Sequence, residues 1–301
     1  MSTSIDLHIH TTCSDGTFTP KEIIDIANKN NVKVISITDH DSIKAYDEEL
    51  FLYAKEKGIK LIPGVEISTK YYGIGIHVLG YNFDLKNKEL NDCLDKAQNA
   101  RRDYLINVSK KLNELGYIVN TKELNELPTV TKAHIAKDVV SNKSNESLLI
   151  KEFNHIPDMG EFIETIMNEN CPAYVKKFSI TPIEVTKIIK NANGKVILAH
   201  PVCYVYEDNL EVTKIFDLIK LMDIDGIEAH YLFLNKDNIN QDESKFWDDY
   251  AKGNNLLSTL GSDFHQLDNK HIELGFNNSN FKISSEEENK IIEYLTKKVW
   301  I

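Results

Sequence analysis

Histidines and carboxylates in this chain occur in short groups whose spacing could hold metal ions. His8 and His10 lie two residues apart in the segment IDLHIH, and a strand there would place both imidazoles on one face, roughly 7 Å apart. That separation suits two ligands of one metal. Asp263 and His265 repeat the spacing near the other end of the chain. Either pair alone could be polar residues on an exposed strand, but the repetition favours a metal site.

Further polar residues interrupt or follow apolar segments. Asp39-His40-Asp41 follows the apolar run VKVISIT, where the alternative is a solvated loop or a helix N-cap. Glu66 lies within an apolar strand, and because burying an unpaired carboxylate is costly, it should have a metal or a cationic partner. His77 also lies among apolar residues, although a hydrogen-bonded core histidine would show the same pattern.

Alternating strands and helices are expected to position these residues. The predicted strands cover 5–10, 32–38, 60–63 with 65–68, 74–83, 195–199, 226–229 and 256–260, and helices are expected from Pro20, over 181–191 and 210–221, up to about 254 and over 291–299. This βαβ order predicts a mostly parallel sheet or barrel. Polar residues recur where strands should end, at Asp39, His40, Glu66, His200, Glu228, His230, Asp263 and His265. In α/β barrels that end of the strands holds the active site.

The alternation stops between residues 87 and 177. Leu90, Leu94, Leu105, Val108 and Leu112 keep helical spacing there. We therefore expect an inserted, mainly helical subdomain at 87–177, with the barrel formed by 1–86 and 178–301.

Composition narrows the class of protein. No run of about 18 apolar residues is present, and the N-terminal residues do not resemble a signal peptide. The four cysteines form no Cys-x-x-Cys pair, so a reduced, cytoplasmic protein is expected. The formal net charge of −11 argues against stable binding of duplex nucleic acid, which needs a basic surface. It is compatible with phosphate substrates if bound cations make the site locally positive.

Ordered sequence blocks resemble those of the PHP (polymerase and histidinol phosphatase) superfamily. They are DLHIHT with SDG at 6–16, TDHD at 38–41, AHP at 199–201 and GSDFH at 261–265, with GVE at 64–66, HVLG at 77–80 and HIA at 134–136 between them. The resemblance keeps its order over most of the chain. The central insert and AYV at 173–175 resemble the standalone bacterial branch, which includes 3′,5′-nucleoside bisphosphate phosphatases and RNase AM-type 5′-to-3′ exoribonucleases.

The resemblance implies a distorted seven-stranded (β/α) barrel that carries an inserted helical subdomain and binds two to three divalent metal ions. His8, His10, Glu66 and Asp263 would hold the first ion; Asp15, His40 and His265, with Glu66 bridging, the second; His77 and His134 would complete the third. Nitrogen and oxygen ligands without a thiolate suit Mn²⁺, Zn²⁺ or Fe²⁺ rather than a closed structural zinc.

Other site residues follow from the same resemblance. Asp39 would orient a neighbouring imidazole or a bridging water. His200 would protonate the leaving alkoxide or hold the phosphate, and a supporting role behind the ligands is an equal alternative. Lys132 stands where the family commonly has an arginine, which loses the bidentate grip on phosphate. Arg101 and Lys177 are further substrate-binding candidates, for which a solvated helix face is the alternative.

The function implied is metal-assisted hydrolysis of a phosphomonoester in a small phosphorylated nucleotide, such as a 3′,5′-bisphosphate, or at the 5′ end of a short RNA. A water activated by the metals would attack phosphorus. The alternatives are a histidinol-phosphate phosphatase and a non-catalytic, metal-stabilised binding module. His155 and His271 are expected on the surface, and His230 outside the metal site.

Overall fold

The computed structural model describes residues 3–176, 179–234, 240–267, 272–275 and 283–297. Contacts divide the chain into two compact units: residues 1–94 with 179–301, and residues 95–178. Helix α3 (Lys88–Glu114) runs across the first boundary, so the division by contacts falls later than position 87, where the sequence pattern changes. The assignment of 87–177 as a separate domain stays a prediction.

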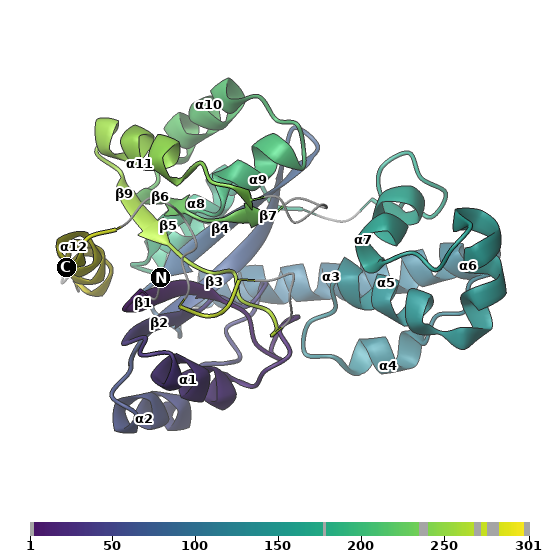
Figure 1. Ribbon diagram of the computed structural model, residues 1–301, viewed down its shortest axis with the longest axis horizontal. Helices are drawn as coiled ribbons and strands as arrows, with labels where there is room; N and C mark the ends of the chain where they lie inside the picture. The colour runs from purple at the N-terminus through teal and green to yellow at the C-terminus, as the bar shows by residue number, and fades with distance from the viewer. Residues whose placement is uncertain (1–2, 177–178, 235–239, 268–271, 276–282, 298–301) are drawn as a thin grey trace. The chain divides into compact units, whose positions relative to one another are not determined.

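A seven-stranded sheet forms the centre of the first unit, in the order β1-β2-β3-β4-β5-β6-β9 (Figure 1). The strands are β1 (Ile5–Ile9), β2 (Val34–Ile37), β3 (Lys60–Tyr71), β4 (Ile74–Tyr81), β5 (Lys195–Leu198), β6 (Gly226–His230) and β9 (Leu257–Leu260). Ile9 at the end of β1 pairs with Phe264, just after β9, and the amide of His10 donates to the carbonyl of Phe264 at 2.9 Å. The sheet therefore nearly closes on itself, which confirms the predicted distorted barrel of seven strands.

Strand β4 is antiparallel to both of its neighbours, whereas the other neighbouring strands are parallel. Only Tyr72 and Gly73 connect β3 to β4, and so short a connection can join antiparallel strands only. The mixed sheet thus follows from one tight hairpin placed where a crossover helix would otherwise stand.

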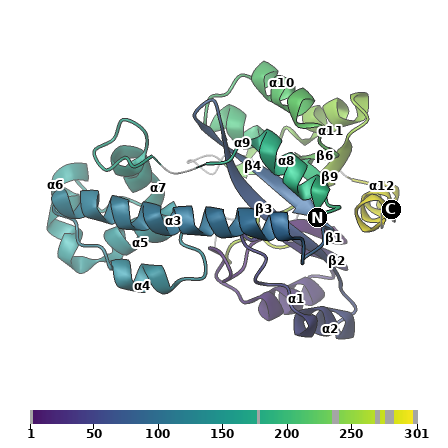
Figure 2. The same ribbon diagram turned by 180° about the vertical axis from the view of Figure 1, so that it is seen from behind.

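Helices surround the sheet of the first unit (Figure 2). They are α1 (Pro20–Lys29), α2 (Glu48–Glu56), α8 (Pro182–Asn191), α9 (Pro201–Tyr206), α10 (Val212–Met222), α11 (Ser244–Gly253) and α12 (Ser285–Thr296). Thr19 and Thr181 form capping boxes in front of the prolines that begin α1 and α8, so the sequence marks both starts. Two short strands, β7 (Phe233–Leu234) and β8 (Asn240–Gln241), pair separately.

The core of the first unit has an outer part, where helices pack on strands, and an inner part. Helices α1 and α2 pack on β1 and β2, and α8, α10 and α11 pack on the strands from β3 to β6. The inner cluster includes Leu7, Tyr81 and Leu260, and α12 adds Ile291 and Leu295 to it. Apolar packing on both faces holds the strands in place, so the polar residues at their C-terminal ends have a rigid base.

The second unit has its own apolar core, which includes Leu105, Val108, Ile135, Phe162 and Met167. Its elements are the C-terminal part of α3, α4 (Thr121–Glu126), α5 (Lys132–Ser141), a 3₁₀ turn (Lys143–Asn145), α6 (Glu146–Phe153), α7 (Met159–Phe162) and a π turn (Ile163–Met167). In the described part of the chain, no helix combines the length and apolar character needed to cross a membrane.

Candidate metal centre

One buried glutamate on β3, Glu66, lies at the centre of a histidine cluster. Its side chain is 1% exposed. Its Oε2 lies 3.5 Å from Nε2 of His8, 3.3 Å from Nε2 of His10 and 2.9 Å from Nδ1 of His40, and its Oε1 lies 2.9 Å from Nδ1 of His77 and 3.1 Å from Nε2 of His200. A carboxylate with imidazoles around both oxygens is placed to bridge cations.

Asp263 approaches the same two histidines from the loop after β9. Its Oδ1 lies 3.3 Å from Nε2 of His8 and 3.1 Å from Nε2 of His10, and these two nitrogens are themselves 3.2 Å apart. The backbone of Asp263 is left-handed, with φ of +51°, which turns its carboxylate back over the strand ends. Tyr231 donates its hydroxyl to the second oxygen, Oδ2, at 3.1 Å.

A third carboxylate, Asp15, belongs to the loop after β1. Its Oδ1 lies 3.6 Å from Nδ1 of His10 and 3.4 Å from Nε2 of His265, and its Oδ2 lies 3.7 Å from Nε2 of His40. His10 therefore presents one ring nitrogen to Glu66 and Asp263 and the other to Asp15. Ligand atoms come together in three sets: His10, Asp15, His40 and His265; His8, His10 and Glu66; His40, Glu66 and His77.

A bulge in β1 aims the first histidine pair. Asp6 pairs with Ile35 and Ile9 with Ile37, so two residues of β1, Leu7 and His8, stand opposite a single residue of β2. Without the bulge Asp6 would share a face with His8. Instead, Asp6 accepts hydrogen bonds from the amide and hydroxyl of Ser262, at 3.0 Å and 2.6 Å.

Glu228 on β6 holds His8 from behind, a role that the sequence analysis did not assign to it. Both carboxylate oxygens lie 3.1 Å from Nδ1 of His8, and Oε2 also accepts the amide of His200 at 2.9 Å. A second bulge between Glu228 and His230 sends the latter side chain elsewhere, toward Asp248 at 3.6 Å. Like Glu66, Glu228 is a carboxylate inside an apolar strand that needs a partner, so the sequence carried a signal for this role.

A glycine permits the close approach of β9 to this pair. A Cβ on Gly261 would lie 2.2 Å from Cβ of His8 and 2.6 Å from Oε1 of Glu228. Real side chains do not tolerate such separations, so only glycine fits at position 261 without displacing His8.

The charges of the cluster depend strongly on one another. Burial alone would raise the pKa of Glu66, but His77, His40 and His8 hold it well below its usual value. In the same way, His8 and His265 lower the pKa of Asp263 against the effect of burial. Burial opposes the charge on His10 too, yet Asp263 and Glu66 raise the pKa of this imidazole to about 10. Without metal, the carboxylates of Glu66 and Asp263 are therefore ionised and the imidazole of His10 carries a proton.

The residues present fit divalent cations. In the described part of the chain, three buried polar atoms that face one another in this cluster have no hydrogen bond: Oδ1 of Asp15, Nδ1 of His40 and Oε2 of Glu66. Nδ1 of His40 and Oε2 of Glu66 lie only 2.9 Å apart, yet their geometry is not that of a hydrogen bond. Buried polar atoms are normally satisfied, so convergent atoms of this kind point to a cation. Nitrogen and oxygen donors without a thiolate suit Mn²⁺, Zn²⁺ or Fe²⁺.

Asp39 supports the cluster indirectly. Its buried carboxylate accepts the amide and hydroxyl of Thr11, at 2.8 Å and 2.7 Å, and the hydroxyl of Ser14 at 2.5 Å. Ser14 in turn lies 3.3 Å from Nδ1 of His10. Asp39 thus reaches the imidazole of His10 through Ser14 and fixes the loop that carries Asp15, and its role in orienting an imidazole or a water stays a prediction.

The remaining predicted site residues lie in the second unit or outside the described residues. His134 on α5 forms a capping box with Thr131. Lys132 donates to Oδ1 of Asn168 at 3.0 Å, and the buried Arg101 lies 3.4 Å from the carbonyl of Val130. Their roles in metal or substrate binding stay predictions. Lys177 lies outside the described residues.

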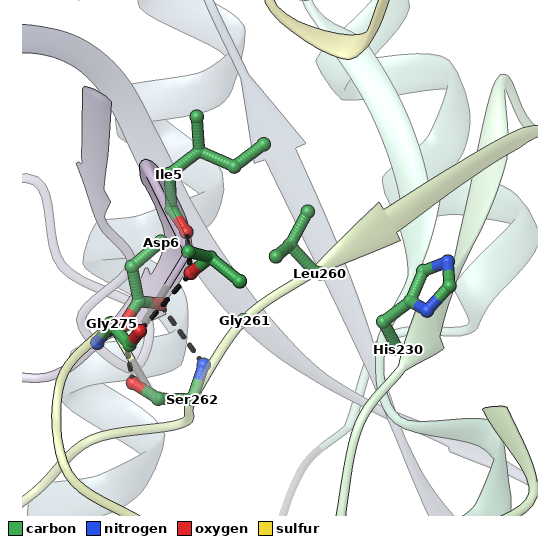
Figure 3. Close-up of a pocket in the computed structure, with 8 residues that line it drawn as sticks. Ile5, Asp6, His230, Leu260, Gly261, Ser262 and Gly275 are labelled. Carbon is green, nitrogen blue, oxygen red and sulfur yellow. Dashed lines mark hydrogen bonds between the residues drawn. The ribbon is translucent and has the colours of Figure 1, made fainter. Parts of the chain in front are cut away.

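His155 and His230 lie apart from the cluster, as expected. His155 is exposed and pairs with Glu161 at 2.8 Å, whereas His271 falls outside the described residues. His230 lines a small cavity together with Asp6, whose hydrogen bonds with Ser262 and Gly275 are drawn in Figure 3. Burial raises the pKa of Asp6 there. None of the nine predicted metal ligands lines this cavity.

The chain is similar to several known proteins. The profile of the PHP domain matches residues 6–193. A 5′-3′ exoribonuclease of Haemophilus influenzae is 32% identical over 282 residues, covering 92% of this chain and 95% of the relative. A 3′,5′-nucleoside bisphosphate phosphatase of Chromobacterium violaceum is 23% identical over 87% of each chain. The fold is similar to that of a proposed metal-dependent phosphoesterase from Bifidobacterium adolescentis, with a TM-score of 0.76, 20% identity and coverage of 98% and 97%.

Proposed function

The chain belongs to the PHP family of metal-dependent phosphoesterases, and we propose that it hydrolyses the phosphoester on the 3′ oxygen of a 5′-terminal nucleotide. A nucleoside 3′,5′-bisphosphate carries a phosphoryl group on that oxygen, and the first linkage of an RNA begins there. One reaction centre could therefore serve both substrates. The exoribonuclease relative, at 32% identity, favours short RNA over the free bisphosphate.

The observation that carries the proposal is the position of Glu66. Its two oxygens contact five imidazoles, three through Oε2 and two through Oε1. A lone buried carboxylate is costly, and a carboxylate surrounded in this way is well suited to neutralise more than one cation.

We assign the ligands in three groups around Glu66. His8, His10 and Asp263 would hold one divalent ion with Glu66, and Asp15, His40 and His265 would hold a second. His77, with Glu66 and His134, is proposed for a third. When bound, such ions lower the pKa of a water molecule and neutralise charge on the phosphoryl oxygens.

His200 is proposed to protonate the leaving 3′ oxygen. The hydrogen bond from its amide to Glu228 holds an unusual backbone conformation, with φ of +22°. This directs Nε2 toward Glu66 and Nδ1 of His77, the latter at 3.4 Å. A positioned general acid typically contributes about 10²- to 10⁴-fold to the rate.

Arg101 and Lys132 of the second unit, with Lys177, are proposed to bind substrate phosphates. A lysine at position 132 attracts phosphate as a point charge, without the two-point grip of a guanidinium. Lys132→Arg should therefore lower KM if this side chain contacts phosphate.

A substrate panel tests the proposal. Protein reconstituted with Mn²⁺, Zn²⁺ or Fe²⁺ would be given 5′-phosphorylated RNA, 3′-phosphoadenosine 5′-phosphate, mononucleotides and histidinol phosphate. We expect nucleotides to be released from the 5′ end of RNA and phosphate from the bisphosphate, with little release from histidinol phosphate. Asp263→Asn should abolish turnover, and His155→Ala, which changes an exposed histidine, should not.

The outcomes separate the candidate functions. Turnover of histidinol phosphate alone would show that the protein is a histidinol-phosphate phosphatase and would contradict the proposed substrate class. Metal binding without turnover of any of these compounds would support a metal-stabilised binding module instead.

A further inference from the structure

Strands β3 and β4 form a hairpin that is longer than the other strands of the seven-stranded sheet (Figure 2). Its pairing is regular from Gly64 opposite Tyr81 to Tyr71 opposite Ile74. Glu66 lies near the start of this ladder and Tyr72 at its tip, six residues later. At about 3.3 Å per residue, the tip lies roughly 20 Å along the strand from Glu66.

The tip of the hairpin carries an aromatic residue whose side chain is exposed and whose backbone is strained. The side chain of Tyr72 is 80% exposed, the highest value among the exposed large hydrophobic residues that the structure describes. Its φ is +49° and that of Gly73 is +87°, the left-handed pair of a two-residue hairpin turn. Asparagine or glycine is preferred at such a position, and a bulky residue there is strained. Tyr72 thus gains little burial in return for its strained backbone.

The neighbouring residue keeps the tip in place. Tyr71 packs against the outer core, and its ring centroid lies 4.5 Å from that of Tyr72 in an edge-on arrangement. Tyr71 thus contacts the ring of Tyr72, while the tip itself is open: a Cβ on Gly73 or Gly75 would have no atom within 4 Å.

A cation lies between the metal centre and this aromatic ring. Side chains alternate along a strand, so Glu66, Ser68 and Lys70 share one face of β3, and Ile67 and Tyr71 share the other, packed on the outer core. Gly75 stands opposite Lys70 and leaves room above the strand. Carboxylate, hydroxyl, ammonium and aromatic groups therefore follow one another outward from the metal centre.

We infer that Lys70 and Tyr72 bind single-stranded RNA downstream of the bond that is hydrolysed, and this inference rests on the proposed function. Lys70 attracts a backbone phosphate, and Tyr72 stacks on a base without regard to its identity. Single-stranded nucleic acids are commonly bound by such combinations of positive charge and exposed aromatic rings. A mononucleotide held at Glu66 is too short to reach a ring roughly 20 Å away, so the hairpin selects for an oligonucleotide.

The test measures RNA binding separately from turnover. The Mn²⁺-loaded full chain is titrated into a fluorescent, hydrolysis-resistant phosphorothioate RNA of about ten nucleotides, a length within the range of single-strand sites. Tyr72→Asn removes the ring and supplies a residue suited to the left-handed turn, so its Tm should equal or exceed that of the wild type. Phe246→Ala, which removes another exposed aromatic side chain, is the matched control.

We expect Tyr72→Asn to weaken RNA binding at least about fivefold, and Tyr72→Trp to restore it. Lys70→Gln should reduce the slope of log affinity against log salt by about 0.7, the loss of one phosphate contact on a single strand. Turnover of 3′-phosphoadenosine 5′-phosphate should be unchanged in both variants, and Phe246→Ala should bind RNA normally.

Wild-type affinity for RNA in Tyr72→Asn, or no RNA binding by the wild type, would overturn the inference. If Tyr72→Asn binds RNA as tightly as the wild type and the wild type hydrolyses RNA, the proposed function survives without the stacking site. If Tyr72→Asn loses RNA binding but the wild type hydrolyses no RNA, the stacking site stands and the proposed function falls.

Discussion

Replacing Gly261 with alanine should disturb the metal centre through a single added methyl group. The new Cβ would lie 2.2 Å from Cβ of His8, whereas unbonded carbons rest about 3.5 Å apart or more, so His8 or the loop after β9 must move by about 1.3 Å. A misplacement of about 1 Å at a reaction centre can reduce the rate about 100-fold. We therefore expect Mn²⁺ affinity and kcat/KM to fall about 100-fold, or roughly 2.8 kcal/mol.

Isothermal titration with Mn²⁺ and RNA hydrolysis would measure the effect. Gly253→Ala is the matched control, because a Cβ there meets no atom within 4 Å and Gly253 lies at the end of α11. It should keep full metal affinity and stabilise the helix by up to about 1 kcal/mol. Unchanged metal affinity and activity in Gly261→Ala would show that the approach of β9 to His8 does not set the geometry of the centre.

Three further predictions concern the support of His8 by Glu228, the protonation of His10 and the ion pair of Glu287. Glu228→Gln removes the charge behind His8 and should weaken metal binding about 10- to 100-fold in titration calorimetry, whereas an unchanged affinity would mean that Glu228 has no part in orienting His8. Because Asp263 and Glu66 raise the pKa of His10 to about 10, this imidazole is protonated at neutral pH and must release its proton to the buffer when a metal binds. The affinity for metal should therefore rise with pH, and titration calorimetry in buffers of different ionisation enthalpy should detect the released protons. Lys252 and the cap at Ser284 lower the pKa of Glu287 to about 2 from the usual 4.5, so their stabilisation is present above pH 4.5 and is lost as the pH falls toward 2. Glu287→Gln should cost at most about 1 kcal/mol at neutral pH in denaturant unfolding, since the pair is partly exposed.

The architecture of the barrel was largely predictable because its signals are local. Apolar runs, prolines in first helical turns and the threonine caps at Thr19 and Thr181 mark where elements begin. The antiparallel β4 could also have been read from the sequence, because Tyr72-Gly73 leaves too few residues for a crossover between strands.

The precise aim of side chains was not predictable in the same way. The alternation of side chains along a strand predicts that Asp6 and His8 share one face of β1 and that Glu228 and His230 share one face of β6. A bulge separates the two residues of each pair. Every residue of β1 and β6 is buried, so no exposed position marks where the alternation changes. The pairing of Glu228 with His8 joins residues 220 positions apart, and only the closed sheet brings them together.

The central claim is that Glu66 bridges divalent cations in a phosphoesterase site. Anomalous diffraction from a crystal of the Mn²⁺-loaded protein tests it most directly, because peaks identify metal positions independently of activity. We expect at least two peaks, each about 2.0–2.3 Å from an oxygen of Glu66 and from imidazole nitrogens of the cluster. Peaks that lie away from Glu66, or a fully loaded crystal with one metal that Glu66 does not touch, would contradict the account.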